Sequence, residues 1–322
     1  MLDSSGRKIE YLRISVTDRC NLRCCYCMPE NGVEPLEHGD ILSYEELLRL
    51  TGLLASLGIR KVRLTGGEPL VRRGLPSLVS GIKSITGIES VCLTTNGVLL
   101  AEQLPELASA GLDGVNISLD AACEEVFCKI THRSGIESVF RSIEAAVEMG
   151  LPVKINCVPM PENESQLIPL AERFLPREGF SLRFIELMPI GMGKNALGLS
   201  PDRVKNLLTE RFGELYPLKG ERLAGPCRYF GVSGMPGRLG FISAVSNCFC
   251  QSCNRVRLTS TGFLKTCLQF DRGAALKPML GKTDEEILEA MKKAIFEKPA
   301  HHLFAGGEGE QLESHIMSQI GG

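Results

Sequence analysis

Four cysteines lie within eight residues in the segment CNLRCCYC, residues 20–27. Three of them, Cys20, Cys24 and Cys27, have the spacing C-x3-C-x2-C, and their thiolates could hold three irons of a [4Fe–4S] cluster while the fourth iron lacks a protein ligand. Two other sets stay open: Cys25 in place of Cys24, or all four closing the coordination of a cluster or zinc ion. Adjacent cysteines point differently in most backbone conformations, so we expect Cys25 to be a spectator.

A second cysteine group, Cys250-x2-Cys253-x13-Cys267, lies in the last third of the chain. Three thiolates at this spacing would suit a second cluster. A zinc ion is the alternative, with Cys248 or distant Cys227 as fourth ligand. Structural zinc sites need four ligands, and no histidine lies nearby in the sequence, so we favour the cluster.

Arg255 and Arg257 directly follow the second group in the run NRVRL. Alternate residues of an extended segment project from one face, and a guanidinium group binds phosphate oxygens in pairs. The run therefore predicts a phosphate-bearing ligand beside this group. A solvated arginine pair is the alternative.

The composition limits the function classes. The chain has 322 residues, 13 cysteines and a net charge of −2. An odd number of cysteines in a long chain without a signal peptide favours metal ligation over disulfides. The small net charge gives no basic field for nucleic acid, and no run of about 18 apolar residues predicts a membrane span. We expect a cytoplasmic protein with neither nucleic-acid nor membrane partners.

Strands and helices must alternate to position these residues. The expected strands are 11–16, 61–65, 90–95, 114–119, 152–158 and 181–187, and the expected helices are Ser43–Gly58 (with a Ser43/Glu46 capping box), 101–110, 137–149 and 165–175. Parallel strands need crossovers that are usually helical. Six such units fall short of the eight in a closed barrel. The sequence thus predicts an α/β fold, an open, partial TIM-type barrel.

The pattern changes after residue 198. The following elements are a helix from Ser200–Pro201, glycine-punctuated antiparallel strands over 225–246, the second cysteine group, a helix over 283–296 and a tail ending in Gly321–Gly322. We predict two parts: a barrel core at 1–198 and a C-terminal region at 199–322 that closes the barrel and carries the second cluster.

CNLRCCYC after a strand, together with TGGEP at 65–69, resembles the radical S-adenosylmethionine (SAM) superfamily. In that superfamily three cysteines hold a [4Fe–4S] cluster and SAM chelates the fourth iron. One electron then cleaves SAM to methionine and a 5′-deoxyadenosyl radical. The resemblance implies SAM contacts at Tyr26, Gly67, Glu68, Ser118 and Met188.

Further motifs narrow the resemblance across nearly the whole chain. LRISVTDRCNLRCCYCMP, TGGEPL, TTNG, NISLD, ELMPIG, CxxCNRVRL and a terminal Gly-Gly are similar to the GTP 3′,8-cyclase family. This implies a lyase with two [4Fe–4S] clusters and SAM as cosubstrate, which acts first in molybdenum cofactor biosynthesis. The radical would abstract the 3′ hydrogen of GTP, and C3′ would join C8 to give (8S)-3′,8-cyclo-7,8-dihydroguanosine 5′-triphosphate.

The same resemblance implies roles for individual residues. Cluster ligands are Cys20, Cys24 and Cys27 for the first cluster and Cys250, Cys253 and Cys267 for the second, whose open iron would bind the guanine. GTP contacts are Arg13, Arg63, Thr94, Lys154, Arg255, Val256 and Arg257. Catalytic roles fall on the first three cysteines and on Arg255, Arg257, Gly321 and Gly322.

Implied partners are GTP, SAM, a low-potential electron donor, a second copy in a homodimer and a downstream pterin-forming enzyme. Two other functions stay open. One is a radical SAM maturase that acts on a peptide or protein. The other is a non-enzymatic iron–sulfur electron carrier, which would need neither the GGEP element nor converging cations.

Overall fold

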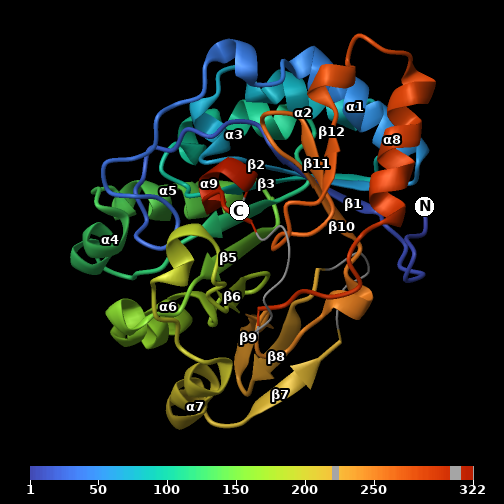
Figure 1. Cartoon of the computed structure of the whole chain (residues 1–322). Helices are drawn as coiled ribbons and strands as arrows, with labels where there is room; N and C mark the ends of the chain where they lie inside the picture. The colour runs from blue at the N-terminus through green and yellow to red at the C-terminus, as the bar shows by residue number, and fades with distance from the viewer. Residues whose placement is uncertain (220–224, 305–312, 322) are drawn as a thin grey trace.

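A single twelve-stranded sheet organises the computed structural model, which describes residues 1–219, 225–304 and 313–321 (Figure 1). The strand order is β12-β11-β10-β1-β2-β3-β4-β5-β6-β9-β8-β7. The sheet therefore continues across the boundary that the sequence predicts at residue 198. No helix among the described residues is both long enough and apolar enough to cross a membrane.

Six parallel strands form the centre of the sheet, as the sequence predicts. They are β1 Tyr11–Ser15, β2 Lys61–Thr65, β3 Ser90–Thr95, β4 Val115–Ser118, β5 Val153–Cys157 and β6 Ser181–Ile185. The connecting helices are α1 Tyr44–Ser56, α2 Leu75–Lys83, α3 Leu100–Ser109, α4 Glu124–Thr131, α5 Ile136–Glu148 and α6 Leu167–Phe174. The predicted capping box is confirmed, because the Glu46 amide donates to Ser43 Oγ and the Ser43 amide donates to Glu46 Oε2.

The C-terminal region extends both edges of this sheet. Its elements are α7 Pro201–Phe212, β7 Leu215–Leu218, β8 Arg228–Val232, β9 Met235–Ile242, β10 Arg255–Leu258, β11 Phe263–Lys265, β12 Gly273–Ala275, α8 Asp284–Phe296 and α9 Met317–Ile320. The predicted antiparallel pairing is found between β8 and β9. The sequence pattern did not predict that β9 pairs parallel with β6, or that β10 pairs parallel with β1.

Eight parallel strands thus lie in succession, from β10 through β1–β6 to β9. Eight is the number in a closed TIM barrel. Here β9 and β10 pair outward with β8 and β11, so the described strands leave the barrel open. The connection from β9 to β10, residues 243–254, joins the two ends of the parallel set and carries Cys250 and Cys253 of the second group, together with Cys248.

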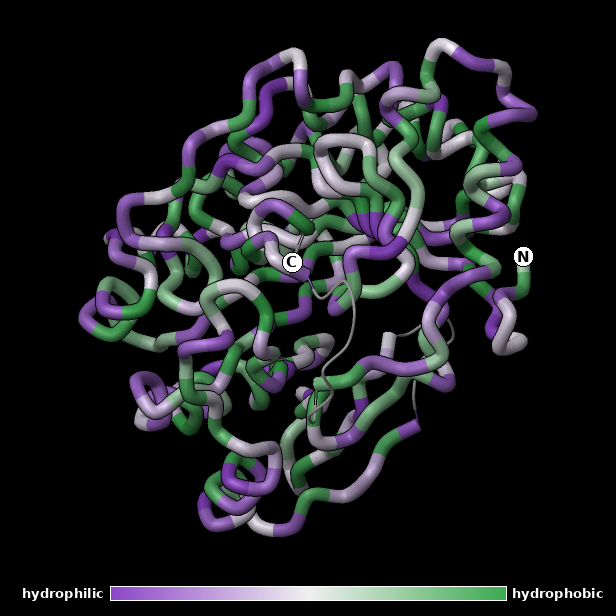
Figure 2. The backbone as a smooth tube through the Cα atoms, in the orientation of Figure 1, coloured by the Kyte–Doolittle hydropathy of each residue, from purple (hydrophilic) through white to green (hydrophobic). Residues whose placement is uncertain are grey.

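The strands alternate between apolar and polar residues, which can be followed in the tube of Figure 2. Leu12 and Ile14 on β1, and Val62 and Leu64 on β2, are buried in the hydrophobic core. A parallel sheet covered by helices on both faces is apolar nearly throughout. The alternation indicates that helices cover only one face and that the other face borders a polar space.

Candidate active site

A cavity of about 350 Å³ lies on the polar face of the sheet. It is lined from both cysteine groups, from β1–β6 and from the C-terminal region. The sequence-predicted residues that line it are Arg13, Cys20, Cys24, Tyr26, Cys27, Arg63, Gly67, Glu68, Thr94, Ser118, Lys154, Met188, Cys250, Cys253, Arg255, Arg257 and Cys267.

The first cysteine group lies on the loop after β1, where parallel barrels carry their active sites. Cys20, Cys24 and Cys27 line the cavity, whereas Cys25 does not. Burial raises the pKa of Cys20 to about 11 and that of Cys27 to about 12. Neighbouring half-buried thiols without a disulfide suit a cation that favours their thiolate form, so this donor set fits the three protein-held irons of a cluster.

Hydrogen bonds also support the first cysteine group. The Leu22 amide donates to Cys20 Sγ at 3.4 Å. Asn96 holds the same loop, because its Nδ2 donates to Asn21 Oδ1 at 2.7 Å. Such bonds fix the direction of a ligand sulfur.

Tyr26 and Glu68 lie on the cavity wall with buried polar partners. The Tyr26 hydroxyl donates to Asp120 Oδ2 at 2.7 Å. Burial raises the pKa of Asp120 to about 6 and that of Glu68 to about 7, although Glu68 accepts bonds from the Asn96 amide and from Thr95 Oγ1. A carboxylate held here would be stabilised by a ligand ammonium group.

Gly66 and Gly67 allow two loops to pack closely together. The Gly67 amide donates to Thr17 O at 2.7 Å, and a Cβ at Gly67 would lie 2.6 Å from Asp18 O. Both glycines line the cavity. They therefore let the loop after β2 pack directly against the loop that carries the first cysteine group.

Among the charged residues of the cavity wall, cations outnumber anions. Nine of its residues are Arg or Lys, and three are Asp or Glu. The strand register places Arg257, Arg13 and Arg63 in one row across β10, β1 and β2. Burial, and then repulsion from Arg257, lowers the pKa of Arg13 well below its ordinary value. Such a concentration of buried positive charge is costly without an anionic ligand.

The same positive charges lower the pKa of Tyr11. Arg63 Nε donates to the Tyr11 hydroxyl at 2.5 Å, and Arg63 Nη1 donates to Thr94 Oγ1 at 3.4 Å. Burial would raise the pKa of Tyr11, but the guanidinium groups of Arg63 and Arg13 lower it to about 8. The Tyr11 hydroxyl therefore loses its proton more readily than that of a free tyrosine.

The structure adds cavity residues that the sequence did not single out. Arg183 on β6 lines the wall beside Asn156, to which its Nη2 donates at 2.5 Å. The Nε of Arg183 is buried and has no hydrogen-bond partner among the described residues. An arginine within the otherwise apolar run LRFI is the signal that could have identified it.

In the second cysteine group, the pKa of one thiol is raised and that of another is lowered. Burial raises the pKa of Cys250 to about 12. Burial would also raise that of Cys253, but Arg255 and Lys298 lower it to about 6. Cys267 completes three sulfurs on the cavity wall, whereas Cys248 is exposed and does not line it. This donor set fits a cluster held by three cysteines.

A histidine does lie near this group, contrary to the expectation from the sequence. His302 has a ring nitrogen within 4.8 Å of the sulfurs of Cys248 and Cys250. His302 lies 52 positions after Cys250, so the spacing of residues around the cysteines could not reveal it. The favoured cluster assignment therefore depends on Cys253 and Cys267 lining the cavity.

The two cysteine groups lie at opposite ends of the cavity. Cys20 follows the carboxyl end of β1, whereas Asn254 O accepts the Tyr11 amide at the amino end of the same strand. Cys253 directly precedes Asn254. Five residues of β1 separate the ends by about 16 Å at about 3.3 Å per residue. A ligand between the groups would face both.

Two predicted residues do not line the cavity. The Val256 side chain is 1% exposed and belongs to the hydrophobic core, because it points to the face opposite Arg255 and Arg257. Gly321 is buried with φ +75°, and its carbonyl accepts from Arg257 Nη1 at 2.5 Å. Gly322 lies outside the described residues.

Comparisons with known proteins find similar sequences over the whole chain. Residues 14–174, half of the chain, match the family model "Radical SAM superfamily", and residues 180–304 match "Molybdenum Cofactor Synthesis C". Proteins named "GTP 3′,8-cyclase" from Clostridium perfringens and Syntrophomonas wolfei are 43% and 46% identical over the full lengths of both chains. The one from Geobacter sulfurreducens is 44% identical over 100% of this chain and 99% of its own.

Solved structures support the fold. The crystal structure of Streptococcus suis SuiB bound to S-adenosylmethionine has a TM-score of 0.63 at 14% identity, over 90% of this chain and 67% of that one. SuiB bound to its precursor peptide SuiA has a TM-score of 0.64 at 14% identity, over 92% of this chain and 66% of that one.

Proposed function

The chain belongs to the GTP 3′,8-cyclase family of the radical SAM superfamily, and we propose that its cavity holds GTP and SAM together for the first step of molybdenum cofactor biosynthesis. The product would be (8S)-3′,8-cyclo-7,8-dihydroguanosine 5′-triphosphate. When bound, the two [4Fe–4S] clusters and SAM supply the radical chemistry of this family.

The cationic wall is the observation that carries the substrate assignment. Arg13, Arg63 and Arg257 form one row, and Lys154 and Arg183 continue the positive charge toward β6. A triphosphate supplies the anionic oxygens that buried guanidinium groups bind in pairs. The same wall is difficult to reconcile with a neutral peptide substrate.

The remaining wall residues orient the two ligands. Glu68 faces the cavity as a buried carboxyl group, so it would accept the SAM ammonium group, with Tyr26, Ser118 and Met188 beside it. Asp120 fixes the Tyr26 ring through its hydroxyl. Arg255 lies on the wall next to Cys253, where a guanine bound at the second cluster would be positioned.

The proposal also covers the electron donor, the oligomeric state, the fate of the product and the location in the cell. We expect a low-potential electron donor, a homodimer, transfer of the product to a pterin-forming enzyme and a cytoplasmic location. We also expect the cluster ligands to be Cys20, Cys24 and Cys27 at one end, and Cys250, Cys253 and Cys267 at the other.

Turnover by the anaerobically reconstituted full chain tests the function. With reductant, SAM should be cleaved to 5′-deoxyadenosine only when GTP is added, and GTP should be consumed in equal amount. Cleavage that required a peptide and ignored GTP would support a maturase. No SAM cleavage by a chain with both clusters would support an electron carrier.

A further inference from the structure

The C-terminal segment 313–321 lies against the cavity-facing side of the sheet, and its short helix α9 is red in Figure 1. Met317 lines the cavity. At the far end of the segment, Gly321 O accepts from Arg257 Nη1 at 2.5 Å. Its Cα also lies close enough to β1 and β2 that an added Cβ would be 2.8 Å from Thr65 Oγ1 and 3.0 Å from Ser15 Cβ.

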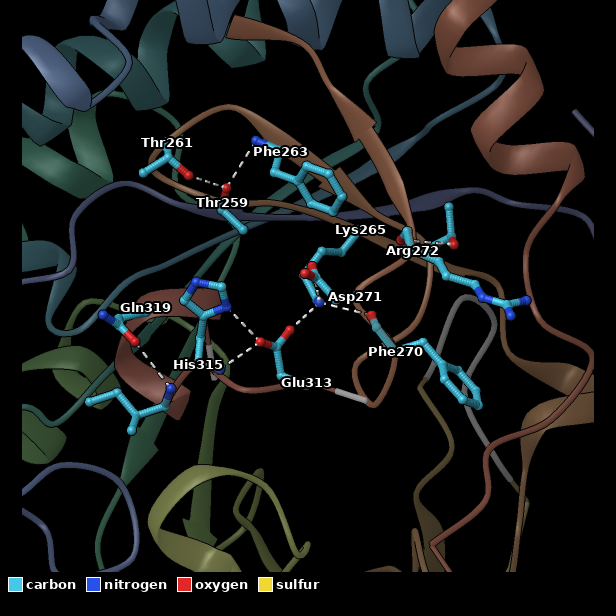
Figure 3. Close-up of polar contacts among 12 residues, drawn as sticks. Thr259, Thr261, Phe263, Lys265, Phe270, Asp271, Arg272, Glu313, His315 and Gln319 are labelled. Carbon is cyan, nitrogen blue, oxygen red and sulfur yellow. Dashed lines mark hydrogen bonds and ion pairs between the residues drawn. The ribbon is translucent and has the colours of Figure 1, made fainter. Parts of the chain in front are cut away.

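A buried ion pair holds the beginning of the same segment (Figure 3). Lys265 and Glu313 have side chains that are each 1% exposed, and they contact each other directly. Lys265 Nζ also donates to Phe270 O at 2.8 Å and lies 3.7 Å from Asp271 Oδ1. A buried ammonium group needs such a partner, because an unpaired charge in this environment costs several kcal/mol.

Glu313 is fixed by further bonds. Its amide donates to Gln269 O at 2.7 Å, and its Oε1 accepts from the His315 amide at 2.7 Å. His315 Nδ1 lies 2.7 Å from the same oxygen. Burial alone would raise the pKa of Glu313, but the hydrogen bond from Lys265 lowers it below its ordinary value. The carboxylate is thus held in its charged form.

Arg257 and Lys265 are direct partners in the antiparallel register of β10 and β11. Directly opposed residues of two strands project from the same face of the sheet. The two neighbouring cations therefore hold the two ends of one segment: Lys265 binds the carboxylate of Glu313, and Arg257 binds the carbonyl of Gly321.

We propose that the Lys265–Glu313 pair anchors segment 313–321 over the cavity and thereby holds the Arg257 guanidinium in position for the substrate. Both are positioning residues, since neither lines the cavity. The anchoring stands on the described contacts alone, whereas the consequence for substrate depends on the proposed function.

Lys265→Met is the variant that separates anchoring from folding. Methionine can fill the space of the lysine stem, and Glu313 on a released segment would be hydrated rather than left buried without a partner. Lys265→Met removes one positive charge and leaves the Glu313 carboxylate, so its loss of GTP affinity includes a lost attraction. Lys265→Met combined with Glu313→Gln removes both charges of the neutral pair and keeps the net charge. A weaker affinity for GTP in this double variant therefore reports the position of Arg257.

Hydrogen exchange and GTP binding on the full chain give two readouts. In Lys265→Met, amides of 313–321 should exchange at least about tenfold faster, while β10 and β11 keep their protection. The dissociation constant for GTP, from equilibrium dialysis, should rise about tenfold in the charge-neutral double variant Lys265→Met with Glu313→Gln. Lys292→Met, which removes an exposed ion pair with Glu289, is the matched control and should change neither.

A double variant tests whether Lys265 and Glu313 act through one contact. Glu313→Gln should also speed exchange, and Lys265→Met combined with Glu313→Gln should exchange no faster than Lys265→Met alone. Unchanged exchange in Lys265→Met would overturn the anchor. Faster exchange with unchanged GTP affinity would overturn the positioning of Arg257. Exchange is independent of turnover, so a chain without cyclase activity would refute the proposed function and leave the anchor standing.

Discussion

At the residue scale, the adjacent residues Cys24 and Cys25 differ in their place relative to the cavity. Cys24 lines the cavity, whereas Cys25 does not, and the Cys25 amide donates to Ile130 O at 2.9 Å. We expect Cys25→Ser to keep the first cluster and turnover, and Cys24→Ser to lose both. Iron content and the visible absorption of the reconstituted variants measure this. The opposite pattern would move the ligand set by one residue.

Arg183 is expected to contribute to GTP affinity although the motifs did not mark it. Its Nε is buried without a hydrogen-bond partner among the described residues, so an anionic oxygen would complete its bonding. Replacing it by glutamine should weaken GTP binding by about 1.5–3 kcal/mol, roughly ten- to a hundredfold. Arg177→Gln, at a surface pair with Glu144, should leave the affinity unchanged in the same dialysis experiment. Equal affinities for both variants would exclude Arg183 from the phosphate site.

Glu68 gives SAM binding a pH dependence. Burial raises the pKa of Glu68 to about 7, so in the SAM-free protein its carboxyl takes up a proton as the pH falls through 7. A protonated carboxyl attracts the SAM ammonium group less, and affinity should fall about tenfold from pH 7.5 to pH 6. Glu68→Gln should bind SAM weakly with a flat profile. A flat profile in the wild-type chain would contradict this assignment.

At the element scale, two glycines should respond in opposite ways to alanine. A Cβ at Gly67 would meet the carbonyls of Asp18 and Arg19, so Gly67→Ala should separate the two loops and lower the free energy of unfolding by more than about 2 kcal/mol. Gly52 lies inside α1 with nothing within 4 Å of its added Cβ. Gly52→Ala should raise stability by about 0.5–1 kcal/mol. Thermal unfolding measures the stability of both variants. Equal shifts in their melting temperatures would show that loop packing does not require a glycine at position 67.

Local sequence could predict the strands and helices whose formation depends on residues that are neighbours in the chain. The six central strands follow from runs such as YLRIS and KVRLT, and α1 follows from Ser43 and Glu46. The parallel pairing of β10 with β1 could not be predicted, because no local signal links residues so distant in the chain. His302 near Cys250 was missed for the same reason. Arg183 lies on β6 outside every motif that the sequence offered, so only its place on the cavity wall marks it.

At the scale of the whole molecule, the two cysteine groups predict the metal content. Anaerobic reconstitution should give about eight irons per chain, four at each end of the cavity. Cys250→Ala should reduce this to about four and leave SAM binding intact, because the first group lies at the other end of β1. Loss of all iron in that variant would argue that the two sites depend on each other.

The pairing of β9 with β6 and of β10 with β1 has a consequence for synthesis at the ribosome. Until residues 235–258 emerge, the core strands have two unpaired edges, and unpaired edges are templates for aggregation. Contacts between residues so far apart in the chain also slow folding. The predicted unit 1–198 is therefore not expected to be stable as a separate fragment. The first strand, β1, gains its second neighbouring strand only after the last third of the chain has been synthesised.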